Sequence, residues 1–168
     1  MARPRTLSDD VIFSTLRQLL ANGGDRAVGF GPVARATGLA ASTLVQRFGD
    51  RDGMVRAALM AAWDHLDAQV ADWAARDGPP QAFLKGLSEQ ADHHPSLTLF
   101  YSRSDPHLRD RATEWRAAVE DELAQRLGGG AKAHEGAALL FAAWQGQMLW
   151  QIAGGKAFRL KDAVRRLG

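Results

Sequence analysis

The sequence predicts an all-α protein. No run of useful length alternates apolar and polar residues as a strand does, and alanine, leucine and arginine, which favour helices, are abundant. Apolar residues instead recur at helical spacing between short breaks that contain glycine or proline. The 168 residues are 46% hydrophobic and 24% charged, which is ordinary for a globular protein with a buried core. One or two small domains are expected from this length.

The first helix is expected to open at Ser8, an N-cap residue that two aspartates follow at the positive end of the helix dipole. Its apolar residues form one helical stripe: Val11, Ile12, Leu16, Leu19 and Leu20. Asn22-Gly23-Gly24 ends it, because glycine and asparagine accept the left-handed conformation that closes helices.

Two short helices follow, at about 32–37 and 41–47, with Pro32 in the first turn of the former and Gly38 making the turn between them. This order of short helix, glycine turn and short helix is typical of a helix-turn-helix, whose second helix enters the DNA major groove. We therefore assign residues 1–48 to a three-helix helix-turn-helix domain.

The remaining helices are expected to form a C-terminal helical bundle over residues 49–168. Asp50 is placed to cap a long connector helix, residues 49–76, which leads out of the first domain. Glycine or proline breaks separate the later helices, which are expected at about 80–93, 96–105, 107–127, 132–153 and 156–166.

The second short helix of the motif carries polar side chains that suit base edges and phosphates. Candidate DNA-binding residues are Ser42, Thr43, Gln46, Arg47 and Arg51, with Arg3 and Arg5 in a basic arm before the first helix. Gln46 in particular can pair twice with adenine. Residues 1–56 hold eight arginines and five aspartates, a net charge of +3, while the rest of the chain carries −1. The positive excess therefore lies where phosphate contacts need it.

Residues 8–60 resemble the N-terminal domain of tetracycline-repressor (TetR) family transcription regulators. The resemblance is carried by the segment Ser42-Thr43-Leu44 and by the junction Phe48-Gly49-Asp50-Arg51-Asp52. The resemblance implies an obligate homodimer, paired through its last two long helices, and a helical C-terminal domain that binds a small molecule. It also implies that Thr43 is the recognition-helix threonine, that Arg51 holds a phosphate, and that Ala41 and Ser42 are the small residues nearest to DNA.

Three positions depart from the family pattern. Val45 stands where the family usually has a tyrosine that donates to a phosphate, and Arg47 stands where histidine is common. Residues 26–31 lack the usual serines and threonines at the entry to the second helix. We expect the phosphate contacts to be redistributed, with Arg47 replacing the contact that Val45 does not make.

The large apolar residues of the second half are assigned by their place in the chain. The resemblance places the middle helices around the ligand cavity, so the ligand-binding candidates are Phe83, Leu87, Phe100, Tyr101 and Trp115. Phe141, Trp144 and Met148 lie on the apolar 132–153 helix with small residues beside them. They are assigned to the dimer interface, with an ordinary core as the simpler alternative.

Together these features lead us to expect a ligand-responsive transcriptional repressor that binds a pseudo-palindromic operator as a homodimer. The partners are then double-stranded DNA, a second copy of the chain and a small-molecule effector; no cofactor or enzymatic activity is expected, because no catalytic motif is present. No apolar run is long enough for a membrane span and no signal peptide is visible. The chain has no cysteine, so we expect a cytoplasmic protein.

Two alternatives stay open. Glu89, His93, His94, His134 and Glu135 offer carboxylate and imidazole groups for a helical-bundle metalloprotein, and two of them share a helix face. Val45 instead favours a protein-binding sensor module whose DNA reader is degenerate. Metal analysis tests the first alternative, and sequence preference with steep salt dependence in DNA binding argues against the second.

Overall fold

A computed structural model describes residues 7–89, 95–154, 159, 162 and 164–165, and these residues contain helices and no strand. The all-α prediction is therefore confirmed for the described part of the chain. The α-helices are α1 (Asp9–Gly23), α2 (Phe30–Thr37), α3 (Ala41–Phe48), α4 (Arg51–Ala74), α5 (Pro80–Glu89), α6 (Pro95–Ser102), α7 (Pro106–Arg126) and α8 (Ala131–Trp150). Two short 3₁₀-helices, η1 (Asp25–Ala27) and η2 (Gln151–Ala153), follow α1 and α8.

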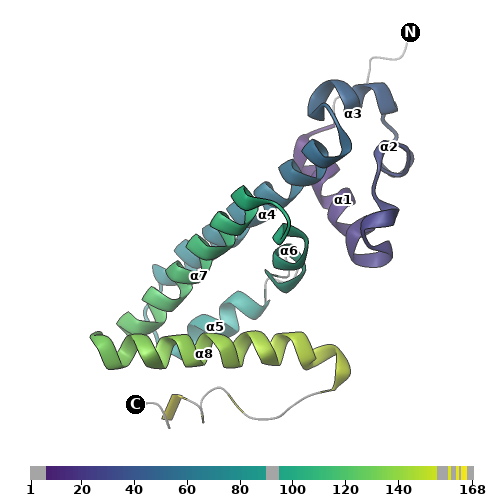
Figure 1. Ribbon diagram of the computed structural model, residues 1–168. Coiled ribbons are helices and arrows are strands. Elements are labelled where there is room, and N and C mark those ends of the chain that lie inside the picture. Colours follow the sequence, from purple (N-terminus) through teal and green to yellow (C-terminus); the bar gives the residue numbers. More distant parts are fainter. Residues whose placement is uncertain (1–6, 90–94, 155–158, 160–161, 163, 166–168) are drawn as a thin grey trace.

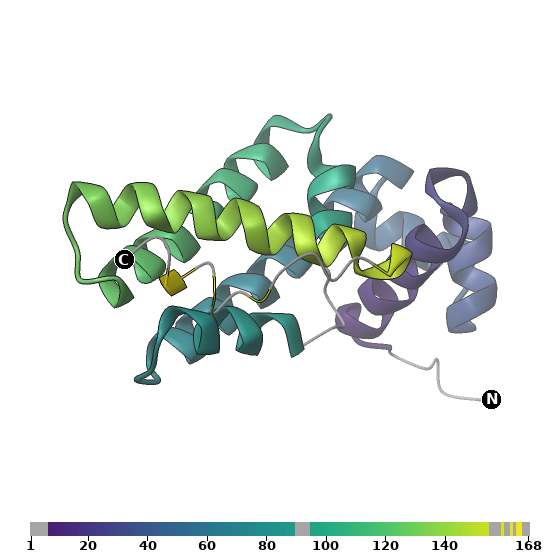
Figure 2. The same ribbon diagram turned by 90° about the horizontal axis from the view of Figure 1, so that it is seen from below.

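The helices form an elongated molecule with two distinct ends (Figure 1). Helices α1, α2 and α3 gather at one end, and α4 leads from them toward the other end, with α7 packed along it. Helix α8 crosses the far end and packs on α7, and α5 and α6 both pack on α4 (Figure 1). Seen from below, α8 lies across the front of the molecule (Figure 2).

The turns follow the residue types that the sequence offers. Gly38 has φ 73° and ψ 13°, so it adopts the left-handed conformation that the turn between α2 and α3 requires. Asp50 caps α4, because its side chain accepts a hydrogen bond from the backbone N of Gly53 at 2.6 Å. Asp105 caps α7 in the same way, accepting from the backbone N of His107 at 3.0 Å.

Several helix ends differ from the expected ones. Ser8 holds the N-cap position of α1, but its hydroxyl makes no capping hydrogen bond. Helix α2 begins at Phe30 rather than at 32. Pro32 is tolerated in its first turn, because the backbone N–H groups of a first turn have no partner within the helix and proline lacks only this group. The described part of α5 ends at Glu89, and α6 begins at Pro95. Most of the helix expected at 156–166 lies outside the described residues.

One buried apolar cluster runs through the whole described molecule. It begins with α1 residues such as Ile12 and Leu16, continues along α4 through Met54 and Trp63, and reaches Trp144 of α8. The cluster therefore includes residues of both expected domains, 1–48 and 49–168. No described helix is long and apolar enough to cross a membrane.

A buried arginine fastens the far end of α4. Arg126 of α7 donates to the carbonyl oxygens of Trp73, Arg76 and Gly78, at 3.0, 2.8 and 2.8 Å. Its Nε also donates to Glu122 Oε1 at 2.6 Å. These bonds join α7 to the last turn of α4 and to the residues that follow it.

Candidate functional site

Helix α3 lies at the end of the molecule opposite to α8 and presents a polar face (Figure 1). Leu44 is fully buried and fixes the rotation of the helix. Ala41, Ser42 and Gln46 are exposed as a result, and Thr43 is half-buried. No side chain caps the first turn, so its leading N–H groups have no partner within the helix. Short hydrogen-bonding side chains and a helix N-terminus are the groups that contact DNA bases and phosphates.

Arg47 turns away from this polar face toward the start of α1. Its Nη1 donates to the carbonyl oxygen of Leu7 at 2.9 Å and to Asp9 Oδ1 at 3.1 Å. Val45, its neighbour in α3, is an exposed apolar residue. In this structure Arg47 thus ties α3 to α1.

Arg51 has almost all its donors engaged within the chain. Its Nε donates to Val28 O at 3.0 Å, its Nη2 donates to both the backbone oxygen and the carboxylate of Asp25, and its Nη1 donates to Asp52 at 2.9 Å. The hydrogen bond to Asp25 is the main reason that the pKa of Arg51 lies above its ordinary value. Arg51 therefore fastens η1, and with it the approach to α2, to the first turn of α4.

Two other arginines of the first fifty residues have no such contacts within the part of the chain that the structure describes. Arg26 in η1 and Arg35 in α2 are exposed, and neither makes a hydrogen bond or an ion pair with any residue that the structure describes. The sequence offered no signal to separate them from Arg47 and Arg51, because pairing depends on neighbours that lie far away along the chain. Arg3 and Arg5 lie outside the described residues.

A cavity of about 450 Å³ opens between α4, α6, α7 and α8. Its buried lining is apolar and consists of Trp63, Pro95, Ala112, Trp115 and Phe141. Its more accessible lining consists of Leu99, Arg109, Thr113, Arg116 and Gln145. We call it the bundle cavity. Its volume falls within the range of small-molecule sites, roughly 300–1,000 Å³.

Aromatic rings build the wall of the bundle cavity. The Trp115 ring centroid lies 5.8 Å from that of Trp63, 5.9 Å from that of Phe141 and 6.3 Å from that of Trp144. The Trp115 Nε1 is buried and has no hydrogen-bond partner among the described residues. The guanidinium of Arg116 lies 5.4 Å from the centroid of the Phe141 ring, at the edge of this cluster.

A second cavity, of about 570 Å³, lies between η1, the first half of α4, α6 and the start of α7. Its lining includes Arg51 and Arg56 of α4 and Phe100 and Tyr101 of α6. The Nε of Arg56 donates to Asp105 Oδ2 at 2.5 Å, which is the first cause of a pKa of Asp105 below its ordinary value. We call this the junction cavity.

The five residues expected to bind ligand separate into three groups. Trp115 lines the bundle cavity, while Phe100 and Tyr101 line the junction cavity. Phe83 and Leu87 are buried and line neither of these two cavities. The resemblance placed all five on the helices around a cavity, and the packing shows which of these side chains are buried and which line one of the two cavities.

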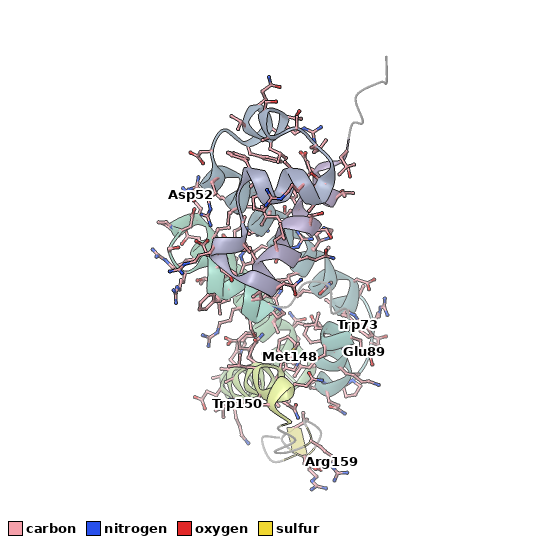
Figure 3. The ribbon with its side chains drawn as sticks, turned by 90° about the vertical axis from the view of Figure 1, so that its right-hand side faces the viewer. Asp52, Trp73, Glu89, Met148, Trp150 and Arg159 are labelled. Atoms are coloured by element: carbon pink, nitrogen blue, oxygen red, sulfur yellow. The ribbon has the colours of Figure 1, made fainter. Side chains whose placement is uncertain are left out.

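Two of the three residues expected at a dimer interface are buried within the described chain. Phe141 and Trp144 are only 9% and 1% exposed, and Trp144 Nε1 donates to Ser88 Oγ of the same chain at 2.8 Å. Both side chains therefore contribute to the apolar core of the single chain, and the dimer interface stays a prediction. Met148 is half-buried near Ser88 of α5, and Figure 3 shows it and Trp150 on different sides of the end of α8.

The outer face of α8 carries large apolar side chains that are exposed to solvent in the described chain. Leu139 is 58% exposed and Trp150 65% exposed, and Leu149 beside it is exposed too. Ala142 and Gly146 lie between them along the same face, and nothing lies within 4 Å of a Cβ built on Gly146. We call residues 139, 142, 146, 149 and 150 the α8 outer face.

The residues of the metalloprotein alternative do not come together in the described structure. No group of three or more histidine, aspartate or glutamate side chains gathers there as a metal site would. His134 contacts the Gly130 carbonyl through Nδ1 at 2.9 Å. His93 and His94 lie outside the described residues.

Comparison with solved structures identifies the fold. A transcriptional regulator from Rhodococcus sp. Rha1 is 21% identical with a TM-score of 0.72, and the match covers 96% of this chain and 92% of that one. PfmR, a TetR family transcriptional regulator from Thermus thermophilus, is 17% identical with a TM-score of 0.65, over 94% of this chain and 95% of its own. KstR2, a ketosteroid transcriptional regulator of Mycobacterium tuberculosis, is 19% identical with a TM-score of 0.62, over 99% and 95%. No protein-family model matches the chain, and a search of curated proteins finds no match in sequence. The chain has the fold of TetR-family regulators.

Proposed function

We propose that this chain is a TetR-family transcriptional repressor of the cytoplasm, whose homodimer binds operator DNA through α3 and releases it when a small molecule occupies the bundle cavity. The observation that carries the proposal is the polar, solvent-exposed face of α3 at one end of a TetR-type fold. Fold alone does not assign a function, so each part of the proposal rests on its own contacts.

The DNA-reading part rests on Ser42, Thr43 and Gln46. Gln46 is exposed on the face that buried Leu44 directs outward, where its amide reaches adenine in a major groove. Arg26 and Arg35 supply the phosphate contacts, because these arginines of η1 and α2 are exposed and have no internal partner among the described residues. Arg47 and Arg51 then position α3 and the start of α4, a change from the direct phosphate contacts implied by the resemblance.

The dimer part rests on the α8 outer face. Exposed leucine and tryptophan side chains with small residues between them let two helices approach closely and bury apolar surface. A second copy of this chain is the partner that fits, because two recognition helices are needed to meet the two halves of a pseudo-palindromic site.

The switching part rests on α6, which contacts both ends of the molecule. Leu99 lines the bundle cavity, and two residues further on the Tyr101 hydroxyl donates to the carbonyl oxygen of Leu20 in α1 at 3.2 Å. Trp63 Nε1 donates to Ser102 Oγ at 3.0 Å and ties α6 to α4. A molecule that displaces α6 therefore acts on the positions of α1 and α4, and by linkage it binds more tightly to the DNA-free form.

DNA binding is tested by selection from random duplexes, followed by titration at several salt concentrations. We expect one preferred pseudo-palindrome. Gln46→Ala should weaken binding to it by roughly 5- to 150-fold, the worth of one bidentate base contact. Gln125→Ala, an exposed glutamine on α7, is the matched control and should have no effect. Arg35→Ala should weaken specific and random DNA alike. Binding with no sequence preference would refute the repressor and favour the degenerate-reader alternative.

The dimer is tested by sedimentation of the full chain. Leu139→Glu should shift the mass toward the monomer, because it places a charge on the α8 outer face without disturbing the core. Val11→Glu, at an exposed valine of α1, is the control and should leave the mass unchanged. A Leu139→Glu protein that stays dimeric would contradict the assignment of this face.

A further inference from the structure

We propose that the ligand of the bundle cavity is an amphipathic organic anion, a molecule with an apolar body and one carboxylate or comparable acid group. The inference rests on the proposed ligand response and adds the chemical class of the ligand. It follows from how apolar and charged groups divide between the buried and the accessible parts of the lining.

The buried part of the bundle cavity selects an apolar body. Trp63, Ala112, Trp115 and Phe141 are all buried, and none presents a charge. Burial of ligand carbon against these rings contributes roughly 25 cal/mol per Å² of apolar surface removed from water. A charged group at this depth would lose its hydration without a counter-charge, so the polar end of the ligand belongs at the opening.

The opening selects a negative charge. Arg109 and Arg116 line it, and no aspartate or glutamate that the structure describes lines the cavity with them. The Nε of Arg116 donates to Glu120 at 2.7 Å, and Nη1 of Arg109 donates to the Arg103 carbonyl at 3.1 Å. The other donors of both guanidinium groups have no partner among the described residues. Arginine matches the planar geometry of a carboxylate with paired donors, so an acid group complements this opening and an ammonium group is repelled.

Both arginines have a contact within the chain that orients the side chain at the opening. Arg116 lies against the face of Phe141, and Glu120 fixes its Nε one turn further along α7. Arg109 lies closer to the N-terminus of α7, and its Nη1 donates to the carbonyl oxygen of Arg103, which follows the end of α6. The α6 residue Leu99 lines the same cavity, so a ligand whose acid group is bound by these α7 arginines contacts α6 through its apolar body, and α6 also contacts α1.

Three probes with the same ten-carbon tail separate the chemical classes: decanoate, 1-decanol and decylamine, each titrated calorimetrically into the full chain below its aggregation concentration. We expect decanoate to bind on the order of tenfold more tightly than decanol, the combined worth of two partly exposed charge pairs. Decylamine should bind most weakly. Equal or tighter binding of decanol or decylamine, or no binding of any of the three, would overturn the proposal.

Variants locate the preference. Arg109→Gln combined with Arg116→Gln should bring decanoate to within about threefold of decanol, since the charge pairs are lost while the apolar wall stays. Arg76→Gln is the matched control, because Arg76 also stacks on an aromatic ring, that of Trp73, and pairs with an acid four residues away, but lines neither cavity. It should keep the full preference. A preference that survives the double substitution would place the anion elsewhere and refute the site.

DNA binding by the same preparations distinguishes this proposal from the proposed function. A chain that binds its selected operator but shows no preference for decanoate refutes the ligand class alone. A chain that prefers decanoate through Arg109 and Arg116 but has no sequence preference in DNA refutes the repressor and leaves the anion site standing.

Discussion

Arg126→Ala should be among the most destabilising single changes in the molecule. The Arg126 side chain is 9% exposed, and it donates to three carbonyl oxygens at and beyond the end of α4 and to Glu122, whose side chain is 15% exposed. Its guanidinium also lies 5.0 Å from the centroid of the buried Phe83 ring. Alanine would leave Glu122 and the Arg76 and Gly78 carbonyl groups without this donor, while the Trp73 carbonyl would keep its hydrogen bond from the backbone N of Arg76 at 3.2 Å.

The loss of stability follows from the Glu122 carboxylate, which stays largely buried after its partner is removed. Removing one partner of a buried, hydrogen-bonded ion pair costs about 3–5 kcal/mol, mainly because the other charge keeps its desolvation penalty. For a chain of this length each kcal/mol lowers Tm by about 2–4 °C, so the expected shift is roughly 6–20 °C. Arg116→Ala is the matched control on the same helix. Arg116 also pairs with a glutamate four residues away, but it is 57% exposed, so its pair contributes at most about 1 kcal/mol.

Urea and thermal unfolding of the two variants at one protein concentration provide the measurement, since the stability of an oligomer depends on concentration. Arg126→Met serves as a second variant, because its unbranched side chain keeps the packing on Phe83 but not the donors. It should recover only a small part of the loss. If Arg126→Ala and Arg116→Ala lower the free energy of unfolding by the same amount, the account of Arg126 as a buried fastener is wrong.

Three further predictions concern single positions. Gly86→Ala should destabilise the fold by about 1–3 kcal/mol in urea unfolding, because a Cβ there overlaps the ring of Trp73; unchanged stability would show that the ring moves freely. Gly146→Ala should raise the free energy of unfolding of the monomer by about 0.5–1 kcal/mol, since a Cβ there has open space and alanine favours a helix; a weaker dimer in sedimentation would show that a partner chain lies close to it. The pKa of Asp105 is lowered in the folded chain, chiefly by Arg56, so its carboxylate stabilises the fold above its ordinary pKa of about 3.9, and this contribution is lost as the pH falls through the lower folded value. Asp105→Asn should therefore flatten the acid side of the stability profile, and an unchanged profile would contradict the pairing.

The sequence predicted most of the helices because their ends are encoded locally. Gly38, Asp50 and Asp105-Pro106 act through their own backbone and their near neighbours, so the turn before α3 and the starts of α4 and α7 are found where those residues stand. Ser8 shows the limit of such signals: it holds the expected position without making the expected bond.

The site was less predictable because side-chain pairing is not local. Arg51 has the position of a phosphate contact in the sequence, yet Asp25 and Val28 engage it across a distance of more than twenty residues. Trp144 has the spacing of an interface residue, but its indole bonds to Ser88, 56 residues away, and turns inward. The DNA-binding, ligand-binding and dimer residues therefore remain predictions. The structure adds which of these side chains are exposed and which are paired or buried within the described chain.

The continuous apolar cluster limits how far the DNA reader can be treated as an interchangeable part. Helix α1 packs on the first half of α4, where the Arg17 guanidinium reaches the Ala58 carbonyl at 3.4 Å. A hybrid regulator joined between residues 48 and 49 would replace the α4 surface on which α1 packs, and the apolar α1 residues Leu16 and Leu20 belong to the cluster that continues into α4. Exchange of specificity between relatives should therefore succeed when the donor segment extends past Leu59, or when only the exposed side chains of α3 are replaced.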